Sequence, residues 1–478
     1  MQVSQDLTRV AAVAAAIRQR IAGRTLAPGA RIPSVRGFAA AMGVSKSTVV
    51  EAYDRLVAEG AIVSRPGSGF YVAGAARPLT LAAIGPRLDR AVDPLWVSRQ
   101  TLEAGAGVLK PGCGWLPPAW LPDEALRRAL RGLARGEAAD LLDYDEPLGH
   151  APLRGLLARR LHDQGIPAGP DRIVLTASAT QALDLIARLL LEPGDTVLVD
   201  DPCYFNFRAL LQAHRAKVVG VPWTPAGPDL DAFAASLRAH GPRFYLTNSA
   251  LQNPTGATMS AATAHRVLRL AEAHDALIVE DALFDDLEPD PSPRLAALDG
   301  LDRVIHIGSF SKTLSAAVRC GHVALRAEWV DRLVDLKLAT SFGSGRLSAN
   351  LVHRFLADGS YRRYLDGLRA RLADAMGLTA RRLGALGLRP WLMPRGGLFL
   401  WAALPAGLDA AVVARRALAE SVVLAPGNVF SLSQSAGRFL RFNVAQSADP
   451  QVFAVLERAM EGEMHATARE RAPAQVRS

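Results

Sequence analysis

Lysine, cysteine and long apolar runs are scarce in this chain of 478 residues. The three cysteines are odd in number and widely spaced, which resembles neither a disulfide framework nor a zinc cluster. No continuous apolar run reaches the roughly 18 residues that a membrane span requires. The N-terminus lacks the basic and apolar regions of a secretory signal. We therefore expect a protein of the reducing cytoplasm, without a membrane partner and without a bound metal.

Positive charge is concentrated at the N-terminal end of the sequence. The whole chain has a net charge of +9, and residues 1–74 carry nine basic and four acidic side chains, a net charge of +5. A small basic domain beside a nearly neutral large one suggests an anionic polymer as partner. A general excess of arginine is the alternative, because only five of the 55 basic residues are lysine.

One of these lysines, Lys312, lies in a stretch rich in small hydroxyl residues, directly after the apolar run Val304–Ile307. A primary amine at the end of a buried strand is well placed to form a Schiff base with an aldehyde. Hydroxyls and free backbone N–H groups beside it can hold a phosphate, and Arg319 adds a fixed positive charge. Together these groups meet the needs of pyridoxal 5'-phosphate (PLP). For this stretch alone, an ordinary surface lysine in a serine-rich loop is the alternative.

The first 74 residues predict a winged helix-turn-helix. Apolar residues at helical spacing predict helices over 10–21, 34–42 and 46–59, and glycine at position 43 separates the last two. Residues 61–72 then predict a β-hairpin with a glycine-rich tip.

The run from Arg31 to Val72, R-I-P-S-V-R-G-F-A-A-A-M-G-V-S-K-S-T-V-V onward, resembles the GntR-family DNA-binding domain nearly throughout. The resemblance implies a double-stranded operator DNA as partner, with the third helix in the major groove and the wing tip near the minor groove. The residues that would face DNA are Arg36, Lys46, Ser47, Thr48, Arg65, Gly67, Ser68 and Gly69.

Residues 75–110 are interpreted as a linker and residues 111–478 as one large domain. No long amphipathic pattern persists before Leu109. Beyond it, short apolar strands alternate with helical segments, which predicts an α/β fold with a mostly parallel sheet. The polar motifs follow the strands directly, where such sheets bind ligands.

Six motifs in this domain resemble those of fold-type-I PLP enzymes of the aspartate aminotransferase class. They are Y-D-E-P-L-G, S-A-T-Q-A-L, N-P-T-G, V-E-D-A-L-F, S-F-S-K-x-x-x-x-x-x-R-x-G and R-F-L-R-F-N-V, in the family's order. The resemblance implies a large domain with a mostly parallel sheet, a small C-terminal α+β subdomain, and a homodimer.

The resemblance also assigns roles to individual residues. Lys312 would form the internal aldimine, Asp281 would face the pyridine nitrogen, and Asn253 would hydrogen-bond the ring hydroxyl. Arg441 would bind a substrate α-carboxylate. The remaining cofactor-binding positions would be Ala179, Thr180, Ser309 and Arg319 at the phosphate, Tyr204 stacked on the ring, and Tyr144 at the phosphate of the neighbouring subunit's cofactor.

Phe284 departs from the family, which usually has tyrosine three places after the aspartate. A phenyl ring cannot donate a hydrogen bond to the ring oxygen, so the pKa of the internal aldimine should rise. Binding can survive this change, whereas transamination should be weak or absent.

A GntR-type domain followed by an aminotransferase-like domain is the layout of the MocR family of bacterial transcriptional regulators. The resemblance implies a DNA-binding regulator that senses PLP, or an amino acid or amine effector, through an aldimine. The alternative is an active PLP-dependent aminotransferase with an accessory DNA-binding domain.

Overall fold

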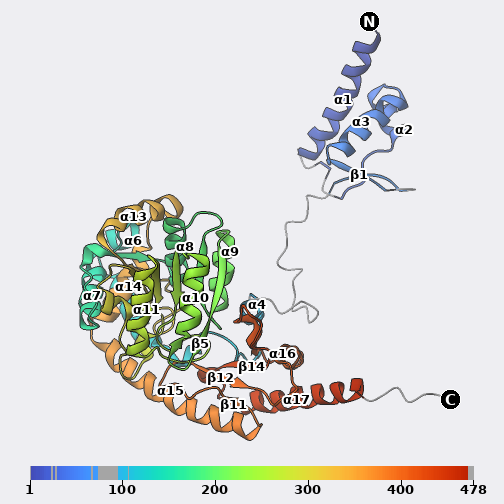
Figure 1. Ribbon diagram of the computed structural model, residues 1–478. Helices are drawn as coiled ribbons and strands as arrows, with labels where there is room; N and C mark the ends of the chain where they lie inside the picture. The colour runs from blue at the N-terminus through green and yellow to red at the C-terminus, as the bar shows by residue number, and fades with distance from the viewer. Residues whose placement is uncertain are drawn as a thin grey trace, which may run out of the picture. The chain divides into compact units, whose positions relative to one another are not determined.

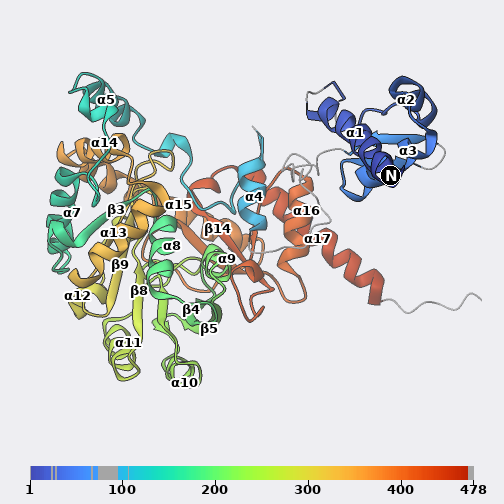
Figure 2. The same ribbon diagram turned by 90° about the horizontal axis from the view of Figure 1, so that it is seen from above.

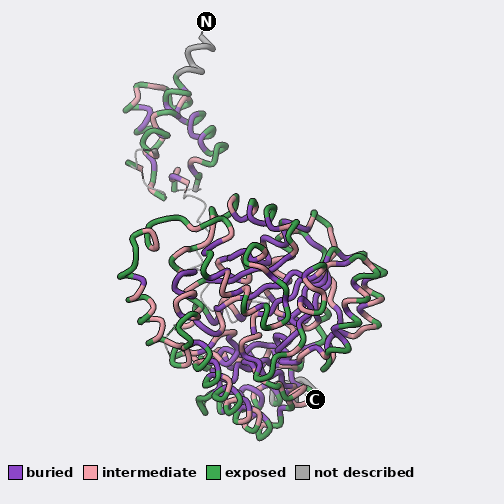
Figure 3. Tube along the Cα trace, turned by 90° about the vertical axis from the view of Figure 1, so that its left-hand side faces the viewer, coloured by how far each residue is buried: buried purple, intermediate pink, exposed green. Residues whose placement is uncertain are grey.

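The computed structural model describes residues 2–22, 25–26, 29–65, 68–73, 95–105 and 107–471. The chain separates into two compact units, Met1–Arg87 and Leu88–Ser478. Each unit has a buried core of its own, and Figure 3 shows buried residues in the interior of the larger one and exposed residues around its rim.

The described residues of the first unit form three helices and one hairpin, drawn in blue in Figure 1. They are α1 (Gln2–Ala22), α2 (Val35–Met42), α3 (Lys46–Ala58), β1 (Ile62–Arg65) and β2 (Gly69–Val72). Ser34 and Ser45 begin α2 and α3 by accepting hydrogen bonds from the backbone N–H of Gly37 and Thr48. Gly43 ends α2 in the left-handed conformation, with φ of 61°, which glycine adopts without strain. This turn separates the two helices of the predicted helix-turn-helix.

The core of the first unit lies among α1, α2, α3 and the hairpin. Strands β1 and β2 pair in antiparallel register, with Ile62 opposite Val72. Tyr53 is fully buried, and its hydroxyl donates a hydrogen bond of 2.9 Å to the carbonyl oxygen of Pro33. The winged helix-turn-helix prediction is therefore confirmed. Gly67 and the side chain of Arg65 lie outside the described residues.

The second unit is built on an eight-stranded sheet with the order β3-β10-β9-β8-β7-β4-β5-β6. The strands are β3 (Ile173–Thr176), β4 (Thr196–Asp201), β5 (Lys217–Thr224), β6 (Gly227–Pro228), β7 (Phe244–Thr247), β8 (Leu277–Asp281), β9 (Val304–Ser309) and β10 (Gly321–Ala324). Neighbours from β5 through β4, β7 and β8 to β9 are parallel, whereas β10 and β6 run antiparallel to their neighbours. The mostly parallel sheet is confirmed.

Helices cover both faces of this sheet (Figures 1 and 2). One face packs on α8 (Ala179–Leu190), α9 (Phe205–Ala213) and α13 (Ala327–Ser341). The other packs on α7 (Ala151–Asp163), α10 (Leu230–His240), α11 (Ala261–Ala273) and α12 (Leu295–Asp299). Consecutive strand residues alternate between the two cores: Val174 and Ile305 belong to the first, Leu175 and Val304 to the second.

A smaller antiparallel sheet with the order β11-β12-β14-β13 forms the C-terminal α+β part. It consists of β11 (Arg389–Pro390), β12 (Phe399–Ala403), β13 (Ala425–Pro426) and β14 (Phe439–Asn443), with α16 (Ala410–Ala419) and α17 (Pro450–Arg471). The other helices are α5 (Asp123–Ala134), α6 (Ala139–Leu142), α14 (Arg346–Ala357) and the long α15 (Ser360–Ala385), which runs from the large sheet toward the small one (Figure 1).

Helix α4 (Trp96–Glu103) is an element that the sequence pattern does not predict. Its eight residues are too few to show a sustained helical period, and its N-cap makes no side-chain hydrogen bond. Trp96 and Val97 are nevertheless buried in the core of the second unit. Tertiary packing rather than local sequence therefore positions α4.

Candidate functional site

Lys312 lies three residues beyond β9, in the turn that leads to β10. Its Nζ donates a hydrogen bond of 2.8 Å to the carbonyl oxygen of Gly114. Burial, followed by the positive charge of Arg441, lowers the pKa of the Lys312 amine to about 8. A lower pKa increases the fraction of Lys312 that is neutral at physiological pH, and the neutral amine is the form that can attack an aldehyde.

The structure brings most of the sequence-predicted site residues together around one cavity of about 150 Å³. These lining residues are Ala179, Thr180, Tyr204, Asn253, Asp281, Phe284, Ser309, Lys312 and Arg319. The cavity lies at the carboxyl ends of β7, β8 and β9, where parallel sheets bind ligands.

One end of the cavity has the properties of an anion site. Helix α8 begins there, and its N-terminal backbone N–H groups carry partial positive charge. Arg319 contributes its guanidinium and has a left-handed backbone, with φ of 50°. Gly321 lets β10 approach the start of α8, because an added Cβ would lie 2.9 Å from the carbonyl carbon of Ser178. The small residues around the start of α8 thus allow close packing of the backbone as well as the binding of an anion.

Asp281 ends β8 with its carboxylate in the cavity. Burial raises the pKa of this carboxyl to about 6, although its Oδ1 accepts a hydrogen bond of 3.1 Å from the backbone N–H of Leu283. Asn248 donates from Nδ2 to the backbone oxygen of Asp281 at 2.6 Å. The buried carboxylate would therefore gain strongly from a nearby cationic nitrogen.

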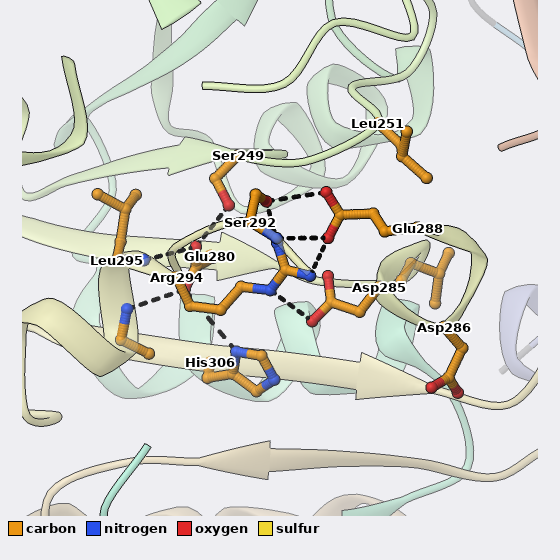
Figure 4. Close-up of polar contacts among 12 residues, drawn as sticks. Ser249, Leu251, Glu280, Asp285, Asp286, Glu288, Ser292, Arg294, Leu295 and His306 are labelled. Atoms are coloured by element: carbon orange, nitrogen blue, oxygen red, sulfur yellow. Dashed lines mark hydrogen bonds and ion pairs between the residues drawn. The ribbon is translucent and has the colours of Figure 1, made fainter. Parts of the chain in front are cut away.

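A buried charged network supports the strand and loop that carry Asp281 (Figure 4). Glu280 accepts hydrogen bonds from the Ser249 hydroxyl at 2.5 Å and from the backbone N–H groups of Leu295 and Ala296, both at 2.9 Å. Burial alone would raise the pKa of Glu280, but His306, Ser249 and Ala296 lower it to about 2. Glu280 therefore stays ionised and ties β8 to the start of α12.

Arg294 holds the loop after Asp281 from the other side. Its Nε lies 3.0 Å from Asp285 Oδ2, and its Nη2 also contacts Glu288 (Figure 4). Arg294 and Glu288 are both almost fully buried. Because one cation serves two buried carboxylates, removal of Arg294 would leave charge uncompensated in the core.

Arg441 projects from β14 and is 1% exposed. Its Nη1 donates to Asn253 Oδ1 and its Nη2 to the carbonyl oxygen of Gly112, each at 2.7 Å. The guanidinium carbon lies 4.2 Å and 4.7 Å from the ring centroids of Phe399 and Phe430. Burial lowers the pKa of Arg441 to about 10, and its Nε has no hydrogen-bond partner in the part of the chain that the structure describes. Arg441 is therefore linked to the cavity by its hydrogen bond with Asn253, which lines the cavity.

Three aromatic residues, Tyr204, Phe207 and Phe284, form part of the cavity wall. Tyr204 begins α9 and contacts the rings of Phe205 and Phe207, with centroids 4.8 Å and 5.5 Å away. Phe284 is 3% exposed, and its ring meets Phe399 edge-on at 5.5 Å. Phe284 therefore contributes apolar surface where a tyrosine would contribute a hydroxyl donor.

Among the predicted cofactor-binding residues, Tyr144 is the one that does not line the cavity. It is 79% exposed, and its ring contacts Phe342 with centroids 5.1 Å apart. Its role at a neighbouring subunit stays a prediction.

Sequence reasoning does not name several residues that shape the site. Asn248 bonds the Asp281 backbone, and Gly112 and Gly114 supply carbonyl oxygens to the two cations. Ser178 and Ser311 also line the cavity, and both belong to motifs that the sequence shows, S-A-T-Q-A-L and S-F-S-K. No local signal marks Gly112 and Gly114, because their role depends on contacts across more than 190 residues of sequence.

The first unit presents the predicted DNA-facing residues around the start of α3. Arg36, Lys46 and Ser47 are exposed, and Thr48 is half-buried. The Ser45 hydroxyl lies 2.8 Å from that of Ser47 and 2.7 Å from that of Thr48. At the wing, the Ser68 hydroxyl lies 2.6 Å from that of Tyr71, and Gly69 begins β2 opposite Arg65. These donors at a helix N-terminus suit contact with phosphates.

Residues 117–458 match the family "Aminotransferase class I and II", which covers more than half of the chain. The chain belongs to this family. Residues 9–72 match the family of bacterial regulatory proteins of the GntR type. The chain is 32% identical to the HTH-type transcriptional regulator YdcR of Escherichia coli (strain K12), covering 90% of this chain and 93% of that protein. It is 27% identical to the regulator YdfD of Bacillus subtilis (strain 168), over 90% and 91% of the two chains. These findings place it among the MocR-type transcriptional regulators.

Solved aminotransferases resemble the second unit of this regulator. One is LysN, the α-aminoadipate aminotransferase of Thermus thermophilus, with a TM-score of 0.71 and 28% identity over 80% of this chain and 99% of that one. An archaeal alanine:glyoxylate aminotransferase gives a TM-score of 0.71 and 26% identity over 77% and 94%.

No helix among the described residues of this regulator is both long and apolar enough to cross a membrane. Over the same residues, no group of three or more histidine, cysteine or acidic side chains could hold a metal ion.

Proposed function

We propose that this MocR-type regulator binds PLP covalently at Lys312 and that the second unit uses it to sense PLP itself or an amino compound. The observation that carries this proposal is the convergence of three features on one cavity: a half-buried lysine of lowered pKa, a buried carboxylate, and a helix N-terminus with an arginine beside it. They match the aldehyde, the ring nitrogen and the phosphate of PLP. When bound, PLP supplies an electrophilic carbon and an electron-withdrawing ring.

Each side chain in the cavity has a task that follows from its position. Asp281 would hold a proton on the ring nitrogen, because a buried carboxylate strongly favours a cationic partner. Asn253 accepts from Arg441 through Oδ1, which leaves its Nδ2 to donate to the ring oxygen. Ser309 and Arg319, with Ala179 and Thr180 at the start of α8, would bind the phosphate. Tyr204 would stack on the ring.

Arg441 would recognise the carboxylate of an amino acid effector. It is buried beside the cavity, with Nε unpartnered and no carboxylate within ion-pair distance among the residues that the structure describes. A carboxylate would supply the missing charge in a two-pronged geometry that only arginine offers.

The regulator hypothesis and the aminotransferase alternative differ at Phe284. Without a hydroxyl there, the ring oxygen has Asn253 as donor, and the nitrogen of Lys312 keeps its proton to higher pH. Slow turnover lets occupancy report effector concentration. The alternative is favoured by the complete set of residues around Lys312, and steady-state transamination with a panel of amino acids separates the two.

The first unit would bind double-stranded operator DNA through α3 and the wing, in a cytoplasmic protein whose three cysteines are all free. The domain limits that we propose are 1–74 for DNA binding, 75–110 for the linker and 111–478 for the cofactor-binding domain.

A homodimer through the second unit is also proposed. Four apolar side chains gather near the end of α6 and the end of α13: Leu141, Leu142, Tyr144 and Phe342, which are 48%, 82%, 79% and 67% exposed. An exposed patch with two aromatic rings in contact is typical of an interaction surface. Analytical ultracentrifugation that shows a PLP-bound monomer would contradict the dimer.

Two lysines of lowered pKa provide the experiment for the covalent site. Lys312 and Lys337 each have a pKa lowered to about 8 by burial, but Lys337 donates to the carbonyl oxygen of Pro147, away from the cavity. Purified protein should show a visible absorbance band with PLP, and borohydride should fix the cofactor. Lys312→Ala should abolish fixation, whereas Lys337→Met should retain it. Fixation that persists in Lys312→Ala would refute the assignment.

A further inference from the structure

The segment Leu109–Trp115, called the wall segment below, runs along one side of the Lys312 site. Its backbone is anchored on the C-terminal part: the N–H of Leu109 donates to Ser421 at 3.0 Å and the N–H of Gly112 to Val423 at 2.8 Å. Asn443 donates from its backbone N–H to the oxygen of Pro111 and from Nδ2 to the oxygens of Cys113 and Trp115. The donors and acceptors in these hydrogen bonds are not groups that we propose to bind a ligand.

Two other carbonyls of the wall segment take their donors from the ligand site. Lys312 Nζ donates to the oxygen of Gly114, and Arg441 Nη2 donates to the oxygen of Gly112. Gly114 lies so close to both cations that an added Cβ would be 3.7 Å from Lys312 Nζ and 4.0 Å from Arg441 Nη2. The wall segment is thus in direct contact with the lysine that would form the covalent bond.

The wall segment is also continuous with the chain that leads to the first unit. Lys110 donates from Nζ to the carbonyl oxygen of Ala104, directly after α4, at 3.2 Å. Helix α4 is held by the buried Trp96 and Val97, and the chain before it leads back to the winged helix. Hydrogen bonds therefore connect Lys312 to the wall segment, and the wall segment to the end of α4.

The hydrogen bond to Gly114 depends on the covalent state of Lys312. A primary amine or ammonium offers two or three N–H donors, whereas a nitrogen in a C=N bond carries at most one. In that state the hydrogen would point to the ring oxygen, so the Gly114 oxygen loses its donor. When an incoming amine replaces lysine, its nitrogen takes over the C=N bond and two hydrogens pass to Nζ. Lys312 is then a primary amine again, and no oxidant is required.

We propose that the Lys312–Gly114 hydrogen bond reports the covalent state of Lys312 to the wall segment, which passes it through Lys110 to α4 and the chain toward the DNA-binding unit. This inference rests on the proposed function. The bond is present when Lys312 is free, is lost when Lys312 carries the cofactor, and returns when an amino compound displaces Lys312. An effector would thus restore the Lys312–Gly114 hydrogen bond that is lost when PLP alone is bound.

The test is hydrogen–deuterium exchange of the full-length protein, with peptides that cover residues 95–105 and 107–116. PLP loading should make exchange in 107–116 faster, on the order of tenfold, as expected for loss of a hydrogen bond to a charged group. Methoxyamine then serves as a probe that needs no knowledge of the effector, because it captures the carbonyl carbon of PLP and frees Lys312. It should return exchange to the level before PLP.

Two variants separate this mechanism from a general effect of PLP binding. Lys312→Ala should exchange fast in 107–116 without PLP and change no further with PLP or methoxyamine. Lys110→Met should keep the response in 107–116 but lose it in 95–105. The inference is overturned if exchange in the wild type is unchanged on PLP loading, if Lys312→Ala responds as the wild type does, or if α4 still responds in Lys110→Met. A wild-type protein with no visible PLP band would overturn the proposed function as well, so the two failures are distinguishable.

Discussion

Two glycines of the wall segment should respond to the same substitution in opposite ways. At Gly114, an added Cβ would lie 3.7 Å from Lys312 Nζ and 4.0 Å from Arg441 Nη2, both ordinary contact distances. The backbone there does not require glycine, so Gly114→Ala should fold normally, with a change in unfolding free energy within about 1 kcal/mol. Its methyl group would lie close to both the amine and the guanidinium, the two groups that we propose to bind an amino acid.

The expected effect of Gly114→Ala is therefore on the ligand alone. Forcing an extra methyl group into a packed site costs about 1–3 kcal/mol, which corresponds to a loss of about 5- to 150-fold in affinity for an amino acid. Spectral titration of the PLP-bound protein with amino acids measures this loss, and the PLP band itself should persist.

Gly112→Ala is the matched control. Its Cβ would lie 2.5 Å from the carbonyl carbon of Leu424 and 2.6 Å from the backbone nitrogen of Ala425, a clash with rigid main chain. This variant should lower the melting temperature strongly or fail to fold. The reasoning is refuted if Gly114→Ala binds amino acids as the wild type does, or if Gly112→Ala is as stable as the wild type.

Three further predictions concern other parts of the molecule. Phe284→Tyr should lower the pKa of the Lys312 nitrogen in the PLP-bound protein, as read from the pH dependence of the visible absorbance. If the native protein transaminates at the roughly 1–10³ s⁻¹ typical of enzymes, the sensor hypothesis is contradicted. Arg36→Ala should weaken binding to a DNA duplex selected from a random pool by about 1–3 kcal/mol and reduce its salt dependence, whereas the control Arg55→Ala, whose guanidinium is paired with Glu51, should change little. Because burial raises the pKa of Asp281 to about 6 in the folded protein, its contribution to stability is full below about pH 4 and is lost as pH rises through 6. In chemical denaturation, the free energy of unfolding of the wild type should fall by about 3 kcal/mol between pH 4 and 7, and Asp281→Asn should abolish this fall. A variant with the same pH profile as the wild type would contradict the prediction.

The sequence predicts the elements whose signals are local. Serines before α2 and α3 and the glycine between them specify the helix-turn-helix, and the apolar strands ending in polar motifs specify where the cavity lies. By contrast, α4 depends on burial of Trp96 and Val97 against residues far away in the sequence. The antiparallel β10 is likewise short, and only its pairing with β3 and β9 defines its direction.

The same distinction applies to the site. Lys312 and Asp281 belong to motifs, so the sequence marks them. The pairing of Arg441 with Asn253 joins residues 188 apart, and its bond to Gly112 spans 329 residues. Arg294, which pairs with Asp285 and Glu288 in the core, belongs to none of the six motifs, because any acid and base that meet in the core could form such pairs. Contacts of this kind follow from the folded topology.

Because Arg441 has no carboxylate partner among the described residues, measurements of thermal stability can identify the effector. A ligand that binds only the folded state raises the unfolding free energy by about 2.7 kcal/mol at a concentration 100 times its Kd. A carboxylate bound at Arg441 would act in this way, because it supplies a counter-charge that no residue in the described part of the chain gives to the buried guanidinium. A melting-temperature screen of the PLP-bound protein against amino compounds, repeated with Arg441→Met, would therefore separate ligands of this site from those that stabilise the protein elsewhere.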